Sequence, residues 1–245
     1  MQKEIHIGTS GWHYKHWMGN FYPPELKSKD FTSHYTRFFK TVEINNSFYR
    51  LPSSGTFLNW RTSVPDDFLF AVKANRFITH MKKLKDPQES LDRFFTNVNA
   101  LGEKLGPILF QLPPGWKVDT ERLQNFLSLL LSYYTYTFEF RHESWYTEDV
   151  LQLLRDYNVS FCIYELAGLM SPIEVTADVV YVRLHGPGGR YAGSYDESAL
   201  RWWANTCLEW QSAGLEVFIY FDNDEAGYAA FNAQRLQELV QNKLM

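Results

Sequence analysis

The sequence predicts a (β/α)8 barrel of the TIM type, formed as a single TIM-barrel domain over residues 1–245. Three observations carry this prediction. Eight short β-rich runs recur along the chain, helical patterns separate most of them, and the length is near that of one α/β barrel. Strands that alternate with helices predict a parallel sheet, and eight strands are the number that closes a barrel.

The expected strands are short runs rich in β-branched and aromatic residues. In chain order they cover residues 5–12, 41–48, 68–75, 106–113, 136–141, 159–164, 179–186 and 216–224. Apolar stripes at helical spacing start at Leu91, Leu123, Leu151, Leu200 and Ala229. The helical pattern is weak in two places, because only residues 56–62 fit a helix after the second strand and residues 165–178 contain Pro172. We therefore expect shortened or irregular helical layers after strands two and six.

Side chains alternate between the two faces of each expected strand. In one register, the face that would meet the helices is apolar in all eight strands, as Val42 and Ile44 illustrate. The opposite face carries Ser10, Glu43, Asn45, Lys73, Gln111, Glu139, Arg141, Arg183, His185 and Asp222. Burying a charge is costly unless it is paired or serves a ligand. Most of these residues fall late in their strands, where TIM-barrel active sites form, so we expect a polar site there.

Seven motifs give the chain a resemblance to a known family. They are GTSGWHYKHWMGNFYP (8–23), VEINNSFYRLPS (42–53), FAVKANRFITH (70–80), KLGPILFQLPP (104–114), FEFRHESW (138–145), YVRLHG (181–186) and YFDNDEAGYAAFNA (220–233). With these motifs the sequence resembles the YecE-like family, a domain family of unknown function whose members are eight-stranded α/β barrels. The resemblance implies the barrel and implies no reaction. The family's motif positions fall on Trp12, Glu43, Asn45, Lys73, Gln111, Glu139, Arg141, Arg183, His185 and Asn223; at Asp222 this chain departs from the asparagine that is common in the family.

The predicted catalytic residues are Glu43, Glu139 and His185. The two glutamates suit an acid–base pair, one protonated and one ionised, and the histidine suits a proton shuttle. The alternative is a structural network in which cationic side chains hold both glutamates. The predicted substrate-binding residues are Trp12, Asn45, Lys73, Gln111, Arg141, Arg183 and Asn223.

The glycine-rich segment 185–197 follows the seventh strand, where many barrels build a phosphate site. Its backbone N–H groups and Arg190 suit an anion. A mobile lid is the competing interpretation, with Tyr191 and Tyr195 as covers.

No metal site and no cofactor are predicted. The chain has no HxH, HExxH or CxxC spacing and no GxGxxG fingerprint. In addition, the cationic side chains of Lys73, Arg141 and Arg183 would repel a divalent ion. A hard-cation site built from Glu43, Glu139 and Asp222 is the alternative.

Composition narrows the function classes. A net charge of −4 and a pI near 6.0 argue against broad non-specific binding of nucleic acid. Two cysteines, no apolar leader and no membrane-length apolar run favour a cytoplasmic protein with no membrane partner.

Three hypotheses remain, and the first is favoured. It is a metal-independent enzyme of hydrolase, lyase or isomerase type, which acts by acid–base chemistry on a small anionic or sugar-like substrate. The second is a nucleic-acid-processing barrel of phosphodiesterase or endonuclease type. The third is a non-catalytic barrel that binds a ligand or a protein.

Overall fold

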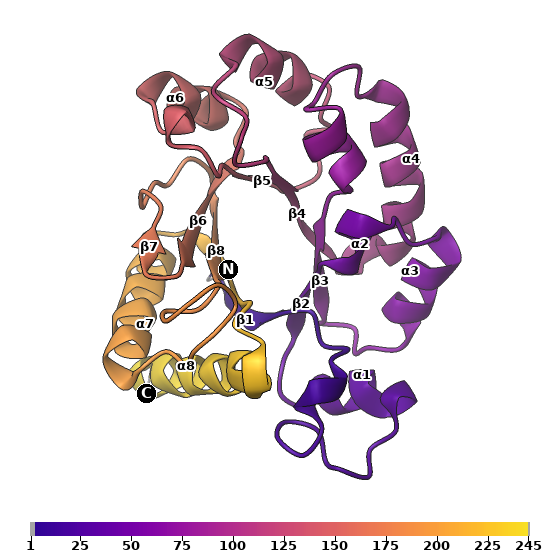
Figure 1. The fold of residues 1–245 in the computed structure, drawn as a ribbon, viewed down its shortest axis with the longest axis vertical. Coiled ribbons are helices and arrows are strands. Elements are labelled where there is room, and N and C mark those ends of the chain that lie inside the picture. Colours follow the sequence, from indigo (N-terminus) through magenta and orange to yellow (C-terminus); the bar gives the residue numbers. More distant parts are fainter. Residues whose placement is uncertain (1–2, 245) are drawn as a thin grey trace. The chain divides into compact units, whose positions relative to one another are not determined.

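The computed structural model describes residues 3–244 and contains all eight expected strands (Figure 1). They are β1 (Ile5–Ser10), β2 (Thr41–Ile44), β3 (Leu69–Lys73), β4 (Leu105–Gln111), β5 (Tyr136–Glu139), β6 (Ser160–Leu166), β8 (Val179–Leu184) and β9 (Glu216–Phe221). The strand order is β5-β4-β3-β2-β1-β9-β8-β6-β7, with a further pairing between β5 and β6. The predicted fold class, a (β/α)8 TIM-type barrel, is therefore confirmed.

Helices follow most of the strands. They are α1 (Phe31–Tyr35), α2 (Asn46–Tyr49), α3 (Ser54–Thr62), α4 (Gln88–Val98), α5 (Thr120–Leu127), α6 (Glu148–Asp156), α7 (Glu197–Ser212) and α8 (Tyr228–Leu244). The irregular layer predicted after β6 is present, because the described chain there forms an antiparallel turn with β7 (Leu169–Met170) in place of a helix. After β2 the helical layer is divided, with the four-residue α2 ahead of the nine-residue α3. The layer after β1 is also short, because α1 has five residues, and the sequence did not predict this.

The chain divides into two compact units. The first comprises residues 1–43, 163–171 and 180–245, and the second comprises residues 44–162 and 172–179. In the first unit, β1 pairs in parallel with β9, from Ile5 opposite Val217 to Thr9 opposite Phe221. Helices α7 and α8 pack against each other and against β9, and both also contact β1 (Figure 1).

A close approach between β1 and β2 sets the register of the first unit. A side chain on Gly8 would place its Cβ 2.4 Å from the carbonyl oxygen of Thr41, so only glycine fits there. The register that results puts Ser10 directly opposite Glu43, at the carboxyl ends of both strands.

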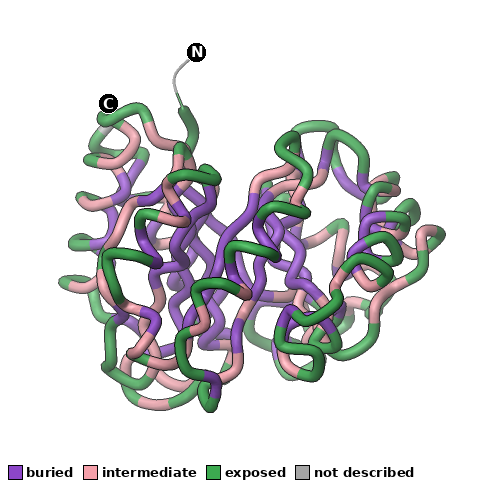
Figure 2. Tube along the Cα trace, turned by 90° about the horizontal axis from the view of Figure 1, so that it is seen from above, coloured by how far each residue is buried: buried purple, intermediate pink, exposed green. Residues whose placement is uncertain are grey.

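In the second unit, β3, β4 and β5 pair in parallel, and the last pair of β4 and β5 sets Gln111 opposite Glu139. The expected apolar stripe of α4 is buried along its length: Leu91, Phe94, Phe95 and Val98. Figure 2 shows the buried residues gathered along interior runs of the chain and the exposed residues on turns and outer helical faces. Within residues 3–244, no helix combines the length and the apolar character that a bilayer crossing requires.

Candidate functional site

A buried ion pair lies at the carboxyl ends of the strands in the first unit. Glu43, the third residue of β2, is fully buried and binds Arg183 of β8 with both carboxylate oxygens. The Arg183 Nη2–Glu43 Oε1 distance is 2.7 Å, and the Nε–Oε2 distance is 2.9 Å. Such bidentate pairs are strong and fix the planes of both groups. Ser10 and Tyr181 also donate to the carboxylate, with 2.7 Å from the Tyr181 hydroxyl to Oε2.

The same arginine extends the network to a histidine and a second carboxylate. Arg183 Nη1 lies 3.2 Å from His185 Nε2, and Nη2 lies 3.1 Å from Asp222 Oδ2. His185 Nδ1 is 2.9 Å from the same Asp222 oxygen. Parity along β8 explains the arrangement, because alternate side chains share one face of the strand. Asp222 directly follows β9, and its backbone N–H donates to the carbonyl of Leu184.

A second tyrosine, Tyr14, joins Tyr181 in this network. Tyr14, in the loop after β1, donates to the carbonyl of Ser10 at 2.7 Å. Burial, and then the carboxylates of Asp222 and Asp224, raise the pKa of Tyr14. Burial and the neighbouring Glu43 carboxylate raise the pKa of Tyr181 in the same direction. Both phenols are therefore neutral hydrogen-bond donors at physiological pH.

His185 is enclosed by aromatic rings and by the glycine-rich loop. Tyr191 packs edge-on against the imidazole, with ring centroids 5.5 Å apart, and Tyr164 lies at 6.4 Å. The Tyr191 backbone N–H donates to the carbonyl of His185 at 2.7 Å. Of the two predicted cover residues, Tyr191 thus lies on the histidine, whereas Tyr195 is buried below the loop.

Asn223 and Tyr195 hold the base of this loop. The Asn223 amide donates to the Gly193 carbonyl at 2.8 Å and to Asn232 Oδ1 at 2.9 Å. The Tyr195 hydroxyl accepts from the backbone N–H of Gly186 at 3.1 Å and hydrogen-bonds Glu165. Burial raises the pKa of Glu165. Asn223, a predicted substrate-binding residue, is therefore placed under the loop.

Trp12 is likewise placed in a packed loop. Its side chain is buried, and the indole N–H donates to Thr32 Oγ1 at 3.0 Å. The predicted residues that the first unit brings into direct contact are Glu43, Arg183 and His185.

The second unit carries a separate carboxylate cluster at the ends of β4 and β5. Glu139 is fully buried and accepts hydrogen bonds from Arg141 Nε and from Gln111 Nε2, the latter at 2.6 Å. The Cys162 thiol lies 3.9 Å from its other oxygen. Three predicted residues, Gln111, Glu139 and Arg141, therefore meet here.

Lys73 and Asn45 occupy other positions in the second unit. The Lys73 ammonium lies 4.4 Å from the centroid of the Phe48 ring, which is the geometry of a cation–π contact. Asn45 directly precedes α2, and its carbonyl accepts the backbone N–H of Phe48.

His80, a residue without a sequence-based prediction, lies beside this lysine. It belongs to a single π-helical turn, Phe77–Met81, and packs edge-on against Phe48 at 4.9 Å. Burial, followed by the charges of Lys73 and Arg76, lowers the pKa of His80 to about 4. Turns of this type are frequent at functional sites, but they leave no periodic signal in a sequence.

The lowered pKa of His80 predicts a pH dependence of stability. Between pH 6.5 and 4 the unfolded chain binds a proton at this residue and the folded chain does not, so stability falls as the pH is lowered through this window. The side chain is only partly buried, and solvent screening limits the effect to about 1–2 kcal/mol. Urea unfolding at pH 8 and pH 5 should show this loss in the native chain and a smaller one in His80→Asn. Equal losses in both chains would contradict the assignment.

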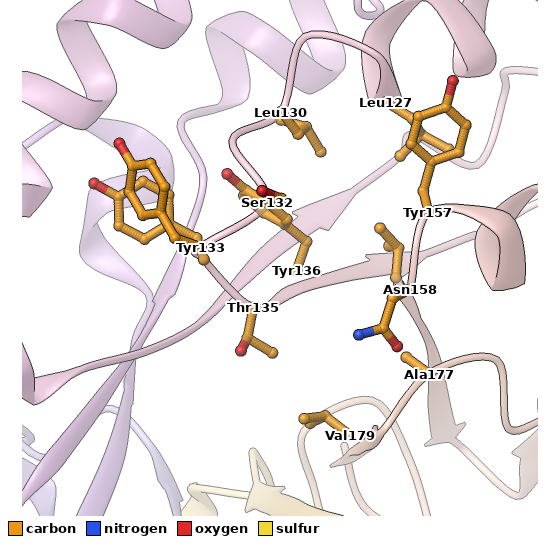
Figure 3. Close-up of a pocket in the computed structure, with 12 residues that line it drawn as sticks. Leu127, Leu130, Ser132, Tyr133, Thr135, Tyr136, Tyr157, Asn158, Ala177 and Val179 are labelled. Carbon is orange, nitrogen blue, oxygen red and sulfur yellow. The ribbon is translucent and has the colours of Figure 1, made fainter.

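A cavity of about 360 Å³ also lies in the second unit, at the amino ends of β5 and β6 (Figure 3). Tyr133 and Tyr157 stand on opposite sides of it in this view, and none of its lining side chains is charged. Catalytic residues of TIM barrels come from the carboxyl ends of the strands, so this cavity is not the candidate site.

Within residues 3–244, histidine, cysteine and carboxylate side chains form no group of three that could hold a metal ion. This finding gives no support to the alternative hard-cation site of Glu43, Glu139 and Asp222.

The strand order and these polar ends of the strands define the class of protein, a TIM-type barrel. Residues 6–244 match the family described as "Protein of unknown function DUF72", and the chain belongs to that family. The predicted membership of the YecE-like family is thereby confirmed.

Relatives with names and structures support the assignment. The chain is 27% identical to the UPF0759 protein YunF of Bacillus subtilis, over 96% of this chain and 94% of YunF. It is 29% identical to YecE of Escherichia coli, over 59% of this chain and 51% of YecE, about half of that protein. A crystal structure of a DUF72 family protein from Thermotoga maritima has a TM-score of 0.87 at 30% identity, and covers 97% of this chain and 99% of that one. An Enterococcus faecalis member, with a TM-score of 0.82 at 20% identity over 97% of this chain and 96% of its own, shares the fold.

Proposed function

We propose that this protein is an enzyme that acts by metal-independent acid–base chemistry, with His185 as the proton-transfer residue. One observation carries the proposal: His185 is held between a guanidinium group at Nε2 and a carboxylate at Nδ1, at 3.2 Å and 2.9 Å. The Arg183 contact requires an unprotonated Nε2, and the Asp222 carboxylate lies at ion-pair distance from Nδ1.

The protonation of the ring follows from its neighbours. Arg183 can only donate, so His185 Nε2 must act as the acceptor and carries no proton. The proton of the neutral ring is then on Nδ1, which faces Asp222. A neutral imidazole of this tautomer has one basic nitrogen, Nε2, so it acts as a general base once the substrate displaces Arg183 Nη1 from that atom. The carboxylate of Asp222 then stabilises the imidazolium that forms.

Glu43 has a different role in this proposal. Its carboxylate is fully buried and accepts from Ser10, Tyr181 and Arg183. A carboxylate so occupied is suited to anchor the arginine rather than to exchange protons with a substrate. In the second unit, Glu139 is held by Arg141 and Gln111, and it is a further candidate for an acid–base residue.

The charge of each cluster favours a polar substrate. In the first unit, two carboxylates and one guanidinium leave an excess of negative charge, which suits the hydroxyl groups of a sugar-like molecule. In the second unit, Arg141 balances Glu139 within their cluster, and Lys73, which lies over the Phe48 ring, adds positive charge that suits an anionic group. Asp222 is 7% exposed, whereas Arg183 is 1% and His185 0% exposed, so we propose that the substrate enters from the side of Asp222. Its entry also requires that the Tyr191 ring move away from the imidazole.

The proposal is tested by incubating the protein with a cell metabolite extract and following consumption and product formation by mass spectrometry. His185→Gln is expected to slow the conversion by about 100-fold or more, the usual contribution of a general base. Asp222→Asn should retain more activity than His185→Gln, since it removes the charge 2.9 Å from Nδ1 but keeps the imidazole. The Glu139→Gln variant tests the second cluster.

The matched control is His34→Gln, because His34 belongs to the same unit as His185. Its ring hydrogen-bonds the carbonyl of Phe21 and lies outside the Arg183 network. Its conversion rate should equal that of the native protein. A metabolite that binds but is never converted would identify a non-catalytic barrel, and full turnover by His185→Gln would exclude this residue as the base.

A further inference from the structure

A groove of about 720 Å³ lies in the second unit, between the segment that joins α2 to α3 and the outer side of α4. Its lining includes Tyr49, Arg50, Pro52, Trp60, Arg93 and Asn97. None of the cluster residues of Glu139 lines this groove, so it is a separate feature of the unit.

The groove carries positive charge that no carboxylate balances. Arg50 and Arg93 are both exposed and both line it. Neither forms an ion pair with a carboxylate anywhere in residues 3–244, and no acidic residue lines the groove. Arg201, another exposed arginine, and the half-buried Arg235 do have such partners. A guanidinium group presents a planar fork of donors that matches a phosphate, so two of them in one groove favour a phosphorylated ligand.

An aromatic surface lies beside this charge. Tyr49 is 72% exposed, far more than its neighbour Phe48, against which it stands at 89° with ring centroids 5.1 Å apart. Trp60 and Pro52 supply further flat apolar surface along the same groove. Aromatic faces of this kind stack on the rings of nucleobases without regard to base identity. Charge and aromatic surface together therefore match a phosphate ester that carries a flat ring.

Hydrogen bonds hold the walls of the groove in place before any ligand arrives. Asn97 of α4 accepts from the backbone N–H of Ser54 at 3.0 Å and from its hydroxyl at 2.9 Å. Ser53 caps α3 by accepting the backbone N–H of Thr56. The start of α3 is thus tied to α4, and a preformed groove loses little entropy when it binds.

We propose that this groove binds a nucleotide phosphate, either as a free nucleotide or as part of a single-stranded nucleic acid. The inference is independent of the proposed acid–base function, because it rests on Arg50, Arg93 and Tyr49 and not on His185. The uncharged cavity of Figure 3, in the same unit, offers no comparable anion-binding groups.

The test is isothermal titration calorimetry of the full chain at low ionic strength. The ligands are adenosine 5′-monophosphate, adenosine, inorganic phosphate and an oligothymidylate of eight nucleotides. The monophosphate should bind at least about tenfold more tightly than adenosine or phosphate alone, because its phosphate contacts the arginines and its base contacts the aromatic rings. Arg50→Ala and Arg93→Ala should each weaken its binding by about tenfold. Tyr49→Ala should weaken it as well, whereas Tyr49→Phe, which keeps the ring, should not.

The matched control is Arg37→Ala, which removes one exposed arginine of the other unit and changes the net charge equally. Its affinity should match that of the native chain. If the oligothymidylate binds more tightly than the monophosphate, and Arg50→Ala weakens its binding by the same factor, the ligand is a single-stranded nucleic acid. If it binds equally or more weakly, the ligand is a free nucleotide. Equal affinities for adenosine and its monophosphate, or unchanged affinity in both arginine variants, would overturn the proposal. Circular dichroism of each variant separates loss of binding from loss of folding.

Discussion

Replacement of Arg183 by methionine is expected to lower the free energy of unfolding by about 3–5 kcal/mol. Arg183 is 1% exposed and contacts the carboxylates of Glu43 and Asp222. A methionine fills much of the same volume but leaves both buried carboxylates without their cation. The net stabilisation by the buried ion pair is smaller than this loss, because most of the loss comes from the buried charge that is left without a partner. Urea unfolding of the native chain and of Arg183→Met measures the difference.

Two further variants show whether the uncompensated charge is the cause. Adding Glu43→Gln to Arg183→Met removes one orphaned carboxylate and should recover part of the lost stability, a coupling that a double-mutant cycle detects. Arg235→Met is the surface control, since Arg235 also contacts two carboxylates, Glu197 and Glu238, but lies on the surface. Its cost should stay below about 1 kcal/mol. If Arg183→Met and Arg235→Met cost the same, the buried network has no special role.

The strands and the residues of the Glu43 network were predictable from a two-residue period. A one-residue change of register would exchange the two faces of every strand, so eight strands with one apolar face define the polar face as well. Arg183 and His185 share the polar face of β8, and the register of β1 and β2 sets Ser10 opposite Glu43. Tyr181 has the same parity as Arg183, so the sequence contained a signal for it that the predictions did not use.

The choice of partners was not predictable in the same way. The sequence offered Lys73, Arg141 and Arg183 as cations for two glutamates, and parity does not distinguish among them. Side-chain reach and rotamers decide that Arg183 holds Glu43 and Arg141 holds Glu139. Tyr14 and His80 come from loops without periodicity, so their places depend on loop geometry alone. Trp12 and Asn223 fall on family motif positions, yet both hydrogen-bond within loops, so a family motif also marks residues that support a loop.

The departure at Asp222 has a structural meaning that its position in the sequence did not reveal. Where the resemblance to the YecE-like family leads us to expect an asparagine, this chain places a carboxylate 2.9 Å from His185 Nδ1. An asparagine would keep the shape of this side chain but not its charge, so the two residues differ in their electrostatic effect on His185. The carboxylate adds stabilisation of a protonated ring, and this is the reason why Asp222→Asn separates orientation from electrostatics in the proposed mechanism.

Substitution of Gly186 by alanine is expected to destabilise the protein by about 2–5 kcal/mol and to disturb the loop that encloses His185. Gly186 has a φ of +107°, which other residues rarely adopt, and a Cβ there would lie 2.3 Å from the carbonyl oxygen of Ala192. Because the carbonyl belongs to the backbone and a Cβ has no rotamer freedom, the loop must move to relieve the overlap. Its base is held by Tyr195 and Asn223, so movement at Gly186 strains the hydrogen bond to Tyr195 and the contact of Tyr191 with His185.

Gly188→Ala is the control within the same loop, because nothing lies within 4 Å of a Cβ at that position. Its stability should remain within about 0.5 kcal/mol of the native value. Thermal unfolding gives the stability difference, and the ring proton shifts of His185 and Tyr191 in nuclear magnetic resonance spectra report their contact directly. Gly186→Ala should shift these signals and Gly188→Ala should not. If the two alanine variants unfold alike and leave the signals unchanged, the loop is not held at Gly186, and the enclosure of His185 depends on other contacts.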